Sequence, residues 1–230
     1  MKSYIETFDN GSGGWFSWAS NTLGPKPLEI KDSVATSRSP WWIDYNHAPP
    51  GAGYLHLPFI LLTRGPLSEH YMEVGGRNAF IEGGFPTNFT NARMTLRIKG
   101  ELEARGAELV LLVQSHVGDT TSGWLLTGQP FRVTVEWSEQ KITTEPDPGQ
   151  WTCLGARRDR ADYYGYIDLQ TVLHNVNCDI LLVLYPLNVM PMGPIDGDPH
   201  VLRAGKDYPV WQSRLPEGYI MLDEVRIDFP

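Results

Sequence analysis

Polar and apolar residues alternate along several stretches of the chain. The clearest are Arg93–Lys99 and Phe131–Trp137, and we also expect strands at the two ends of the chain, at Tyr4–Phe8 and Tyr219–Phe229. Successive side chains of a strand point to opposite faces, so alternation is typical of a strand with one face in the core and one in water. The sequence therefore predicts strands in these four segments.

Two further segments are apolar without alternation, and one has the period of a helix. Glu108–Val113 and Asp179–Leu187 are continuous apolar runs of strand length, which suits the middle of a sandwich. In 169–176 the apolar residues Leu169, Val172, Leu173 and Val176 recur at helical spacing, with Asp168 as an N-cap. We expect an all-β sandwich with one short helix, and a single domain over residues 1–230 because no linker or repeat divides the chain.

Three long irregular stretches lie between these elements. They are Ser39–Gly53, Gly65–Pro86 and Val189–Pro216. Glycine and proline together account for 41 of the 230 residues, which favours tight turns and shaped loops. Long loops in a compact domain tend to carry function, so we expect a binding or catalytic site among them.

Composition and charge exclude several classes of function. The chain carries 27 acidic and 19 basic residues, a net charge of −8, which disfavours nucleic acid as a partner because phosphates are bound by Lys and Arg. No stretch approaches the ~20 apolar residues that span a bilayer, so no membrane association is expected. The N-terminus has no apolar signal region, which indicates a cytoplasmic protein; a secreted protein whose leader has been removed would look the same. Only Cys153 and Cys178 are present, either as buried free thiols or as one bridge.

The two ends of the chain carry a resemblance to a known group. Glu6–Gly11 followed by Gly14-Trp15, and Tyr219–Val225 near the C-terminus, resemble the opening and closing strands of the galactose-binding-like jelly-roll group, which includes many carbohydrate-binding modules. Segments of the middle, Phe131–Trp137, Asp168–Leu173 and Ile180–Leu182, resemble the laminin domain IV type. The resemblance implies a jelly-roll β-sandwich and says little about activity.

The same resemblance implies a structural calcium ion. Acidic residues of the first and last strands hold it in such modules, and the matching positions here are Asp9 and Asp223, with Glu6 and Glu224 nearby. Carboxylate and carbonyl oxygens are the ligands that Ca²⁺ takes. The alternative is that Asp9-Asn10-Gly11 forms a turn that needs no metal.

An aromatic loop is the strongest candidate for ligand binding. Indole and phenol rings stack on the apolar faces of sugars, while carboxylates and imidazoles bond to hydroxyls. Tyr54 and His56 follow two residues apart and share one face of the next strand. The predicted carbohydrate-binding residues are Trp41, Trp42, Asp44, Tyr45, His47, Tyr54 and His56. Alternatively, one of the two adjacent tryptophans plugs the end of the sandwich. A second aromatic group, Tyr163-Tyr164-Gly165-Tyr166, either lines the same cleft or covers the helix.

Three function classes stay open on this sequence. The first is a carbohydrate-binding domain. The second is a small glycan-active hydrolase or lyase in the same cleft, for which loop acids such as Asp44 and Glu82 and the base candidates His47 and His56 are available. The third is a protein-interaction or adhesion domain, which a flat exposed apolar patch would favour. The sequence does not fix the oligomeric state.

Overall fold

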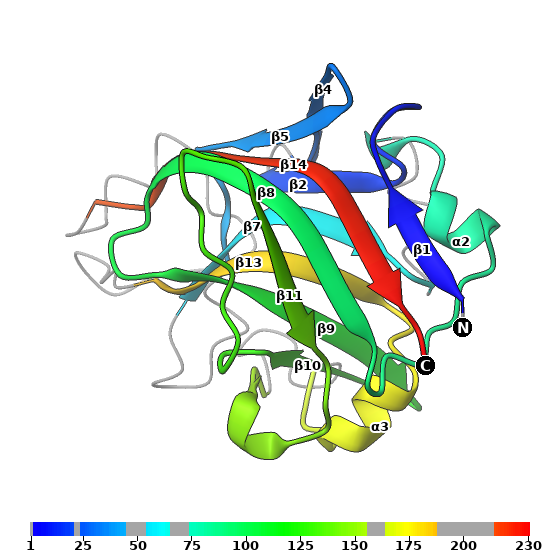
Figure 1. Ribbon diagram of the computed structural model, residues 1–230. Coiled ribbons are helices and arrows are strands. Elements are labelled where there is room, and N and C mark those ends of the chain that lie inside the picture. Colours follow the sequence, from blue (N-terminus) through cyan, green and yellow to red (C-terminus); the bar gives the residue numbers. More distant parts are fainter. Residues whose placement is uncertain (1, 21–23, 45–53, 65–73, 156–163, 188–213) are drawn as a thin grey trace.

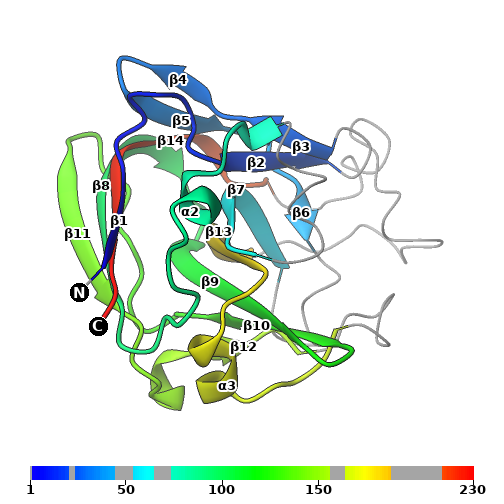
Figure 2. The ribbon, with the colours of Figure 1, turned by 90° about the vertical axis from the view of Figure 1, so that its right-hand side faces the viewer.

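The computed structural model describes residues 2–20, 24–44, 54–64, 74–155, 164–187 and 214–230. Within these segments the chain forms two β-sheets that face each other as layers (Figures 1 and 2). One sheet has the strand order β11 (Ser138–Thr143), β8 (Arg93–Glu103), β14 (Glu217–Asp228), β5 (Val34–Arg38) and β4 (Glu29–Lys31), with β1 (Ser3–Glu6) also paired to β14. The other has the order β12 (Thr152–Cys153), β10 (Thr120–Leu125), β9 (Glu108–Val117), β13 (Asp179–Leu187), β7 (Tyr54–Leu62), β2 (Trp15–Ser20) and β3 (Gly24–Pro27), with β6 (Ile43–Asp44) also paired to β7.

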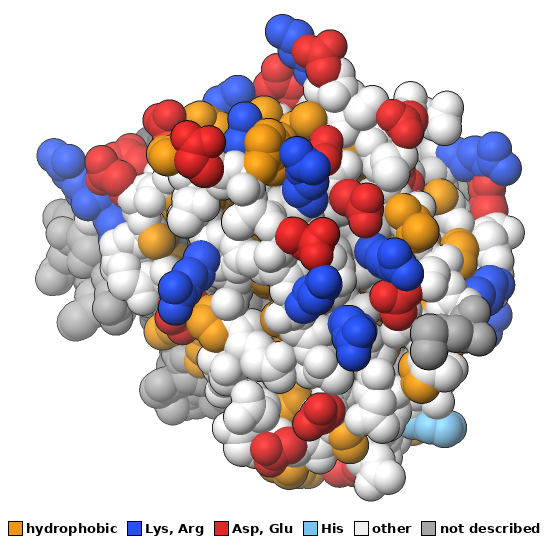
Figure 3. Space-filling view, viewed as in Figure 1, with side chains coloured by type: hydrophobic (Ala, Val, Ile, Leu, Met, Phe, Trp, Pro, Cys, Tyr) orange, Lys and Arg blue, Asp and Glu red, His pale blue; other side chains and the backbone are white. Residues whose placement is uncertain are grey.

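The six-stranded sheet confirms the alternation seen in the sequence. In β8, Leu96 and Ile98 are fully buried while Arg97 between them is exposed. In β14, Ile220 and Leu222 are buried in the same way, and β14 pairs antiparallel with both β8 and β5. The outer face of this sheet carries interspersed acidic and basic side chains (Figure 3). One face therefore meets the core and the other meets water, as expected for an all-β sandwich.

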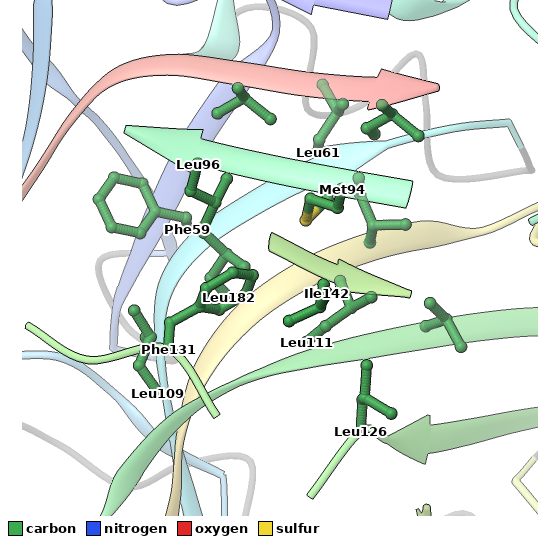
Figure 4. Close-up of a cluster of buried hydrophobic side chains, with 14 of the residues drawn as sticks. Phe59, Leu61, Met94, Leu96, Leu109, Leu111, Leu126, Phe131, Ile142 and Leu182 are labelled. Carbon is green, nitrogen blue, oxygen red and sulfur yellow. The ribbon is translucent and has the colours of Figure 1, made fainter. Parts of the chain in front are cut away.

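The main core fills the space between the sheets. Leu96 and Met94 of β8 lie opposite Phe59, Leu61, Leu111 and Leu182 from the eight-stranded sheet (Figure 4). Each fully buried side chain of this size contributes roughly 1.5–3 kcal/mol of transfer free energy. Packing between the two sheets is therefore the main source of the stability of the fold.

The eight-stranded sheet is buried on both faces in its centre. Its second face carries a separate apolar cluster, formed by Phe16, Trp42, Leu55, Leu57, Ile60, Leu62, Val110, Leu112, Leu125, Leu154, Leu181, Val183 and Tyr185. This explains why β9 and β13 are continuous apolar runs: with both faces covered, no position of the strand has to be polar.

The described residues hold two short α-helices where the sequence predicted one. The predicted helix is α3 (Leu169–His174), and the Asp168 side chain caps it by accepting a hydrogen bond from the Thr171 backbone N–H at 2.9 Å. The other helix, α2 (Ala79–Glu82), is a single turn capped by Asn78 and anchored by the buried Phe80. A 3-10 turn, η1 (Pro148–Gln150), precedes β12.

The prediction of a strand over Phe131–Trp137 is wrong. Phe131 bridges Leu109 of the eight-stranded sheet, whereas the Thr134 carbonyl accepts a hydrogen bond from Gly100 N–H in the six-stranded sheet. The segment therefore contacts both sheets in turn and forms no continuous ladder with either. The regular strand, β11, begins only at Ser138.

Candidate functional site

The structure brings part of the predicted aromatic loop together. Strand β6 pairs with β7 so that Ile43 lies opposite His56 and Asp44 lies opposite Leu55. Trp41 and Trp42 come directly before β6. The ring centroids of Trp41 and His56 are 5.9 Å apart, and His56 Nδ1 is 2.9 Å from the carbonyl oxygen of Trp42. We call Trp41, Trp42 and His56 the aromatic corner.

The three side chains of the aromatic corner are buried. Trp41 is 1% exposed, Trp42 5% and His56 1%. Trp41 belongs to the main core and Trp42 to the second cluster, so the adjacent rings point to opposite sides of the sheet. The Trp41 indole N–H donates to Ser37 Oγ at 2.8 Å, and Ser37 Oγ donates to the Pro58 carbonyl at 2.7 Å. Both rings pack as core residues, and glycan contact by either one stays a prediction.

The other predicted members of the loop are described only in part. Asp44 and Tyr54 lie on β6 and β7, where the backbone alone is described. Tyr45 and His47 lie outside the described residues. Their role as ligand-binding residues stays a prediction.

His56 has an unusual chemical environment for a histidine. A carbonyl oxygen can only accept, so Nδ1 carries the proton and donates to Trp42, which leaves a lone pair on Nε2. Nε2 is buried and has no hydrogen-bond partner among the described residues. Burial lowers the pKa of His56 from 6.5 to about 4, because the charged imidazolium is disfavoured away from water. His56 is therefore neutral in the folded protein at neutral pH.

We predict that His56 makes the protein sensitive to acid. The unfolded chain binds a proton near pH 6.5, whereas the folded protein binds it only near pH 4. This difference in proton binding contributes roughly 3 kcal/mol of stability. The contribution is fully present above pH 6.5 and is lost as the pH falls to 4. Urea unfolding of the wild type and of His56→Asn measures this, and the free energy of unfolding should depend less steeply on pH in the variant. His174→Asn, at an exposed histidine, is the control, and equal slopes for the wild type and His56→Asn would contradict the prediction.

A second candidate site lies on the outer face of the six-stranded sheet. Because Ile220 and Leu222 point into the core, the alternation of β14 turns Tyr219 outward. Tyr219 lies opposite Arg38 of β5 on one side and Glu101 of β8 on the other. The Arg38 guanidinium carbon is 4.8 Å from the centroid of the Tyr219 ring. A cationic group, an aromatic ring and a carboxylate are thus aligned across three strands.

An open hollow of about 640 Å³ lies beside the Tyr219 ring, and we call it the Tyr219 hollow. Its walls include Val133 and Val135 from the segment before β11, and Val135 is 65% exposed. Gly218 permits the close approach of β14 to β8, because a Cβ at this position would lie 2.0 Å from the Glu101 carbonyl oxygen. The hollow therefore combines an aromatic ring, apolar walls and polar groups.

Three carboxylates border the Tyr219 hollow. Glu103 and Glu217 lie opposite each other on β8 and β14, and Arg105 Nη2 bonds to both, at 2.5 and 3.0 Å. Glu101 is the Cα partner of Tyr219 on the neighbouring strand β8. Partial desolvation and the charge of Glu101 raise the pKa of Tyr219 above 10.0, so its hydroxyl remains protonated at neutral pH.

Sequence reasoning missed the Tyr219 hollow. It assigned Tyr219 to the closing strand and attached no chemistry to Arg38 or Glu101. The outward face of β14 could be predicted from alternation. Tyr219 and Asp223 are an even number of positions apart and share one face of the strand, whereas Ile220 and Leu222 lie on the other face. The neighbours of Tyr219 could not be predicted in this way. Arg38 and Glu101 lie about 180 and 118 positions away in the chain, and only the strand register brings them beside Tyr219.

The predicted calcium residues are each engaged with protein groups. Asp223 Oδ2 is 3.0 Å from Arg97 Nε. Asp9 accepts hydrogen bonds from Ser33 Oγ and Thr7 Oγ1, both at 2.6 Å, and these bonds, Ser33 first, lower its pKa. The described part of the chain contains no group of three or more His, Cys, Asp or Glu residues arranged to hold a metal ion. Calcium at Asp9 and Asp223 stays a prediction.

The second aromatic group and the cysteines have structural surroundings. Tyr166 is 69% exposed and packs edge-on against Trp124, whose indole N–H donates to the Ile167 carbonyl before α3. Cys153 and Cys178 are free and part-buried, and burial raises the pKa of both thiols. Of the two alternatives, the structure therefore has free thiols and no bridge between these cysteines.

Comparison with known proteins finds no family and one distant structural likeness to report. No model of a protein family matches the chain, and no curated protein matches it. Among solved structures, the chain is similar to the carbohydrate-binding module CtCBM11, with 10% sequence identity, coverage of 99% of this chain and 95% of that chain, and a TM-score of 0.39. A likeness at this level carries no conclusion about activity. None of the helices in the described segments is long and apolar enough to cross a membrane.

Proposed function

We propose that this β-sandwich binds a carbohydrate and that the Tyr219 hollow is its contact surface. The observation that carries the proposal is the alignment of Arg38, Tyr219 and Glu101 across β5, β14 and β8 beside an open hollow. Binding sites for small ligands are concave and mostly apolar, with a few convergent polar groups that fix orientation. The Tyr219 hollow has these properties.

Each part of the hollow matches one part of a sugar. The Tyr219 ring and the Val133 and Val135 side chains offer apolar surface to the C–H face of a pyranose. The Glu101 carboxylate accepts hydrogen bonds from hydroxyl groups. The Arg38 guanidinium lies over the Tyr219 ring beside the hollow, and although its Nε donates to Glu29 at 3.4 Å, its other N–H groups can donate to a ligand. A pyranose that stacks beside Tyr219 thereby meets both kinds of polar group.

The charges of the hollow favour some sugars over others. Glu101, Glu103 and Glu217 border it, and Arg105 is already paired with the last two. A uronic acid would bring a further negative charge among these carboxylates, and like charges at close range repel. Neutral or amino sugars are therefore the expected class of ligand.

We predict that Tyr219→Ala weakens glycan binding by about tenfold or more, since the apolar stacking surface is lost. A glycan array identifies the ligand, and calorimetric titration of the wild type and the variant measures the loss, once with calcium chloride and once with a chelator. Tyr219→Phe keeps the ring and loses only the hydroxyl, so it should lose far less affinity. Tyr166→Ala, at a tyrosine that is 69% exposed, controls for nonspecific loss of aromatic surface.

Two outcomes would redirect the proposal. Undiminished binding by a folded Tyr219→Ala protein would exclude the Tyr219 hollow, and alanine variants of Asp44, Tyr45, His47 and Tyr54 would then test the predicted loop. Release of reducing ends or of unsaturated products from the bound glycan would instead identify a hydrolase or a lyase. Among the described acids of the hollow, Glu103 and Glu217 are both already paired with Arg105.

A further inference from the structure

A second open hollow, of about 490 Å³, lies at the side of α3, and we call it the α3 hollow. It is formed by three parts of the chain: the segment before β8, the last residue of β9 and the exposed side of α3. Its lining includes Asn88, Thr90, Val117, Gln170, Thr171 and His174. No residue of this lining is an acid, a lysine or an arginine.

Hydrogen bonds within the protein fix the backbone around the α3 hollow. Asn88 Oδ1 accepts from the Thr90 N–H at 3.0 Å, and Asn175 Oδ1 accepts from Thr87 Oγ1 at 2.7 Å. On the helix, the N–H and hydroxyl of Thr171 donate to the carboxylate of Asp168 at 2.9 and 2.7 Å. These bonds fix the Asn88, Thr171 and Asn175 side chains of the lining.

Several hydrogen-bonding groups of this hollow are not used by the protein. The side chains of Gln170 and His174 form no hydrogen bond with the described residues, and both residues are exposed. Thr90 Oγ1 also has no partner in the described part of the chain, but this atom is buried and offers a ligand no accessible surface. The Gln170 amide and the His174 imidazole are thus the groups available to a ligand.

We propose that the α3 hollow is a second binding site, for a neutral sugar or another neutral polyol. Amide and imidazole groups each offer both a donor and an acceptor, which suits the paired hydroxyls of such a ligand. Phosphates and carboxylates are disfavoured because the lining has no lysine or arginine, and a cation is disfavoured because it has no carboxylate. Val117, 43% exposed, gives the ligand a small apolar contact.

The two hollows lie at opposite ends of the sandwich. The Tyr219 hollow includes the end of β8, which leads into the start of β9, whereas Val117 is the last residue of β9. Ten extended residues span about 33 Å, so the two hollows are roughly 30 Å apart. The second site does not rest on the first, and each is tested alone.

The test is a ¹H–¹⁵N NMR titration of the full chain with neutral probes, namely cellotetraose, mannotetraose, xylotetraose and maltotetraose. We expect saturable shifts at Asn88, Gln170 and His174 with at least one probe, and the same shifts in the Tyr219→Ala protein. In Gln170→Ala/His174→Ala the affinity at these positions should fall about tenfold or more, since two polar contacts are lost. Both replaced residues are exposed, so the fold should be retained, and Glu145→Ala at another exposed position is the matched control.

Trigalacturonate and inorganic phosphate complete the titration. Weak or absent shifts with these anions would support a site for neutral ligands, whereas equal or stronger shifts would overturn it. The proposal would also be overturned if no neutral probe shifts these residues, or if the double variant binds as well as the control. Loss of binding at Tyr219 alone leaves the α3 hollow standing, so the two proposals fail separately.

Discussion

Replacement of Trp41 by alanine should destabilise the protein by about 3–5 kcal/mol, the usual cost of removing a buried tryptophan. Trp41 is 1% exposed, belongs to the main core and contacts the His56 ring. The substitution removes this packing and leaves Ser37 Oγ without the indole N–H that donates to it. Urea denaturation of the wild type and Trp41→Ala, analysed for the midpoint and the slope, measures the loss.

A second variant distinguishes packing from ligand contact at Trp41. Trp41→Phe keeps most of the apolar volume, so it should lose much less stability than the alanine variant, about 1–2 kcal/mol. A loss below about 1 kcal/mol in Trp41→Ala would show that the ring is not packed as described. Reduced glycan binding by a variant as destabilised as Trp41→Ala says nothing about contact, and Trp41→Phe is therefore the variant to use in binding assays.

Replacement of Asp179 by asparagine should stabilise the protein at neutral and alkaline pH. Asp179 opens β13 between Leu62 and Gln114, and although the residue is part-exposed, its Oδ1 atom is buried without a partner among the described residues. Burial raises the pKa of Asp179 from 3.8 to about 7. Ionisation therefore costs the folded protein more than the unfolded chain, and asparagine has nearly the same shape with no charge.

The pH dependence of this effect has a definite sign. The folded protein holds the Asp179 proton more tightly than the unfolded chain, so the stability from this group is full below pH 3.8 and is lost as the pH rises through 7. Above pH 7, the free energy of unfolding of Asp179→Asn should exceed that of the wild type by roughly 2–4 kcal/mol. This difference should shrink as the pH falls towards 4. Urea unfolding across this range measures it.

The control for charge removal is Asp119→Asn, at an exposed position of the turn between β9 and β10, where we expect little change. A destabilised Asp179→Asn protein at alkaline pH would contradict the prediction and would indicate a partner that needs the charge. Because His56 and Asp179 act in opposite directions over overlapping pH ranges, the single variants are more informative than the wild-type profile.

Much of the fold could be predicted from local pattern. The strands β8, β9, β13 and β14 and the helix α3 were located from alternation, apolar runs and a capping aspartate, all of which act between residues close in sequence. The same reasoning failed at Phe131–Trp137, where the residues alternate but the segment passes from one sheet to the other. Alternation describes which face a side chain takes, and it does not say whether a neighbouring strand is there to pair with.

The sequence by itself determined an all-β sandwich, the strands that cross its core and the acidic character that disfavours nucleic acid. Only the tertiary structure decided that Trp41, Trp42 and His56 are buried, and that Tyr219 stands between Arg38 and Glu101. The physical reason is that a strand's hydrophobic period is encoded locally, whereas a site is built across strands. Its members meet through the register of ladders that join residues more than a hundred positions apart, and no local pattern carries that register.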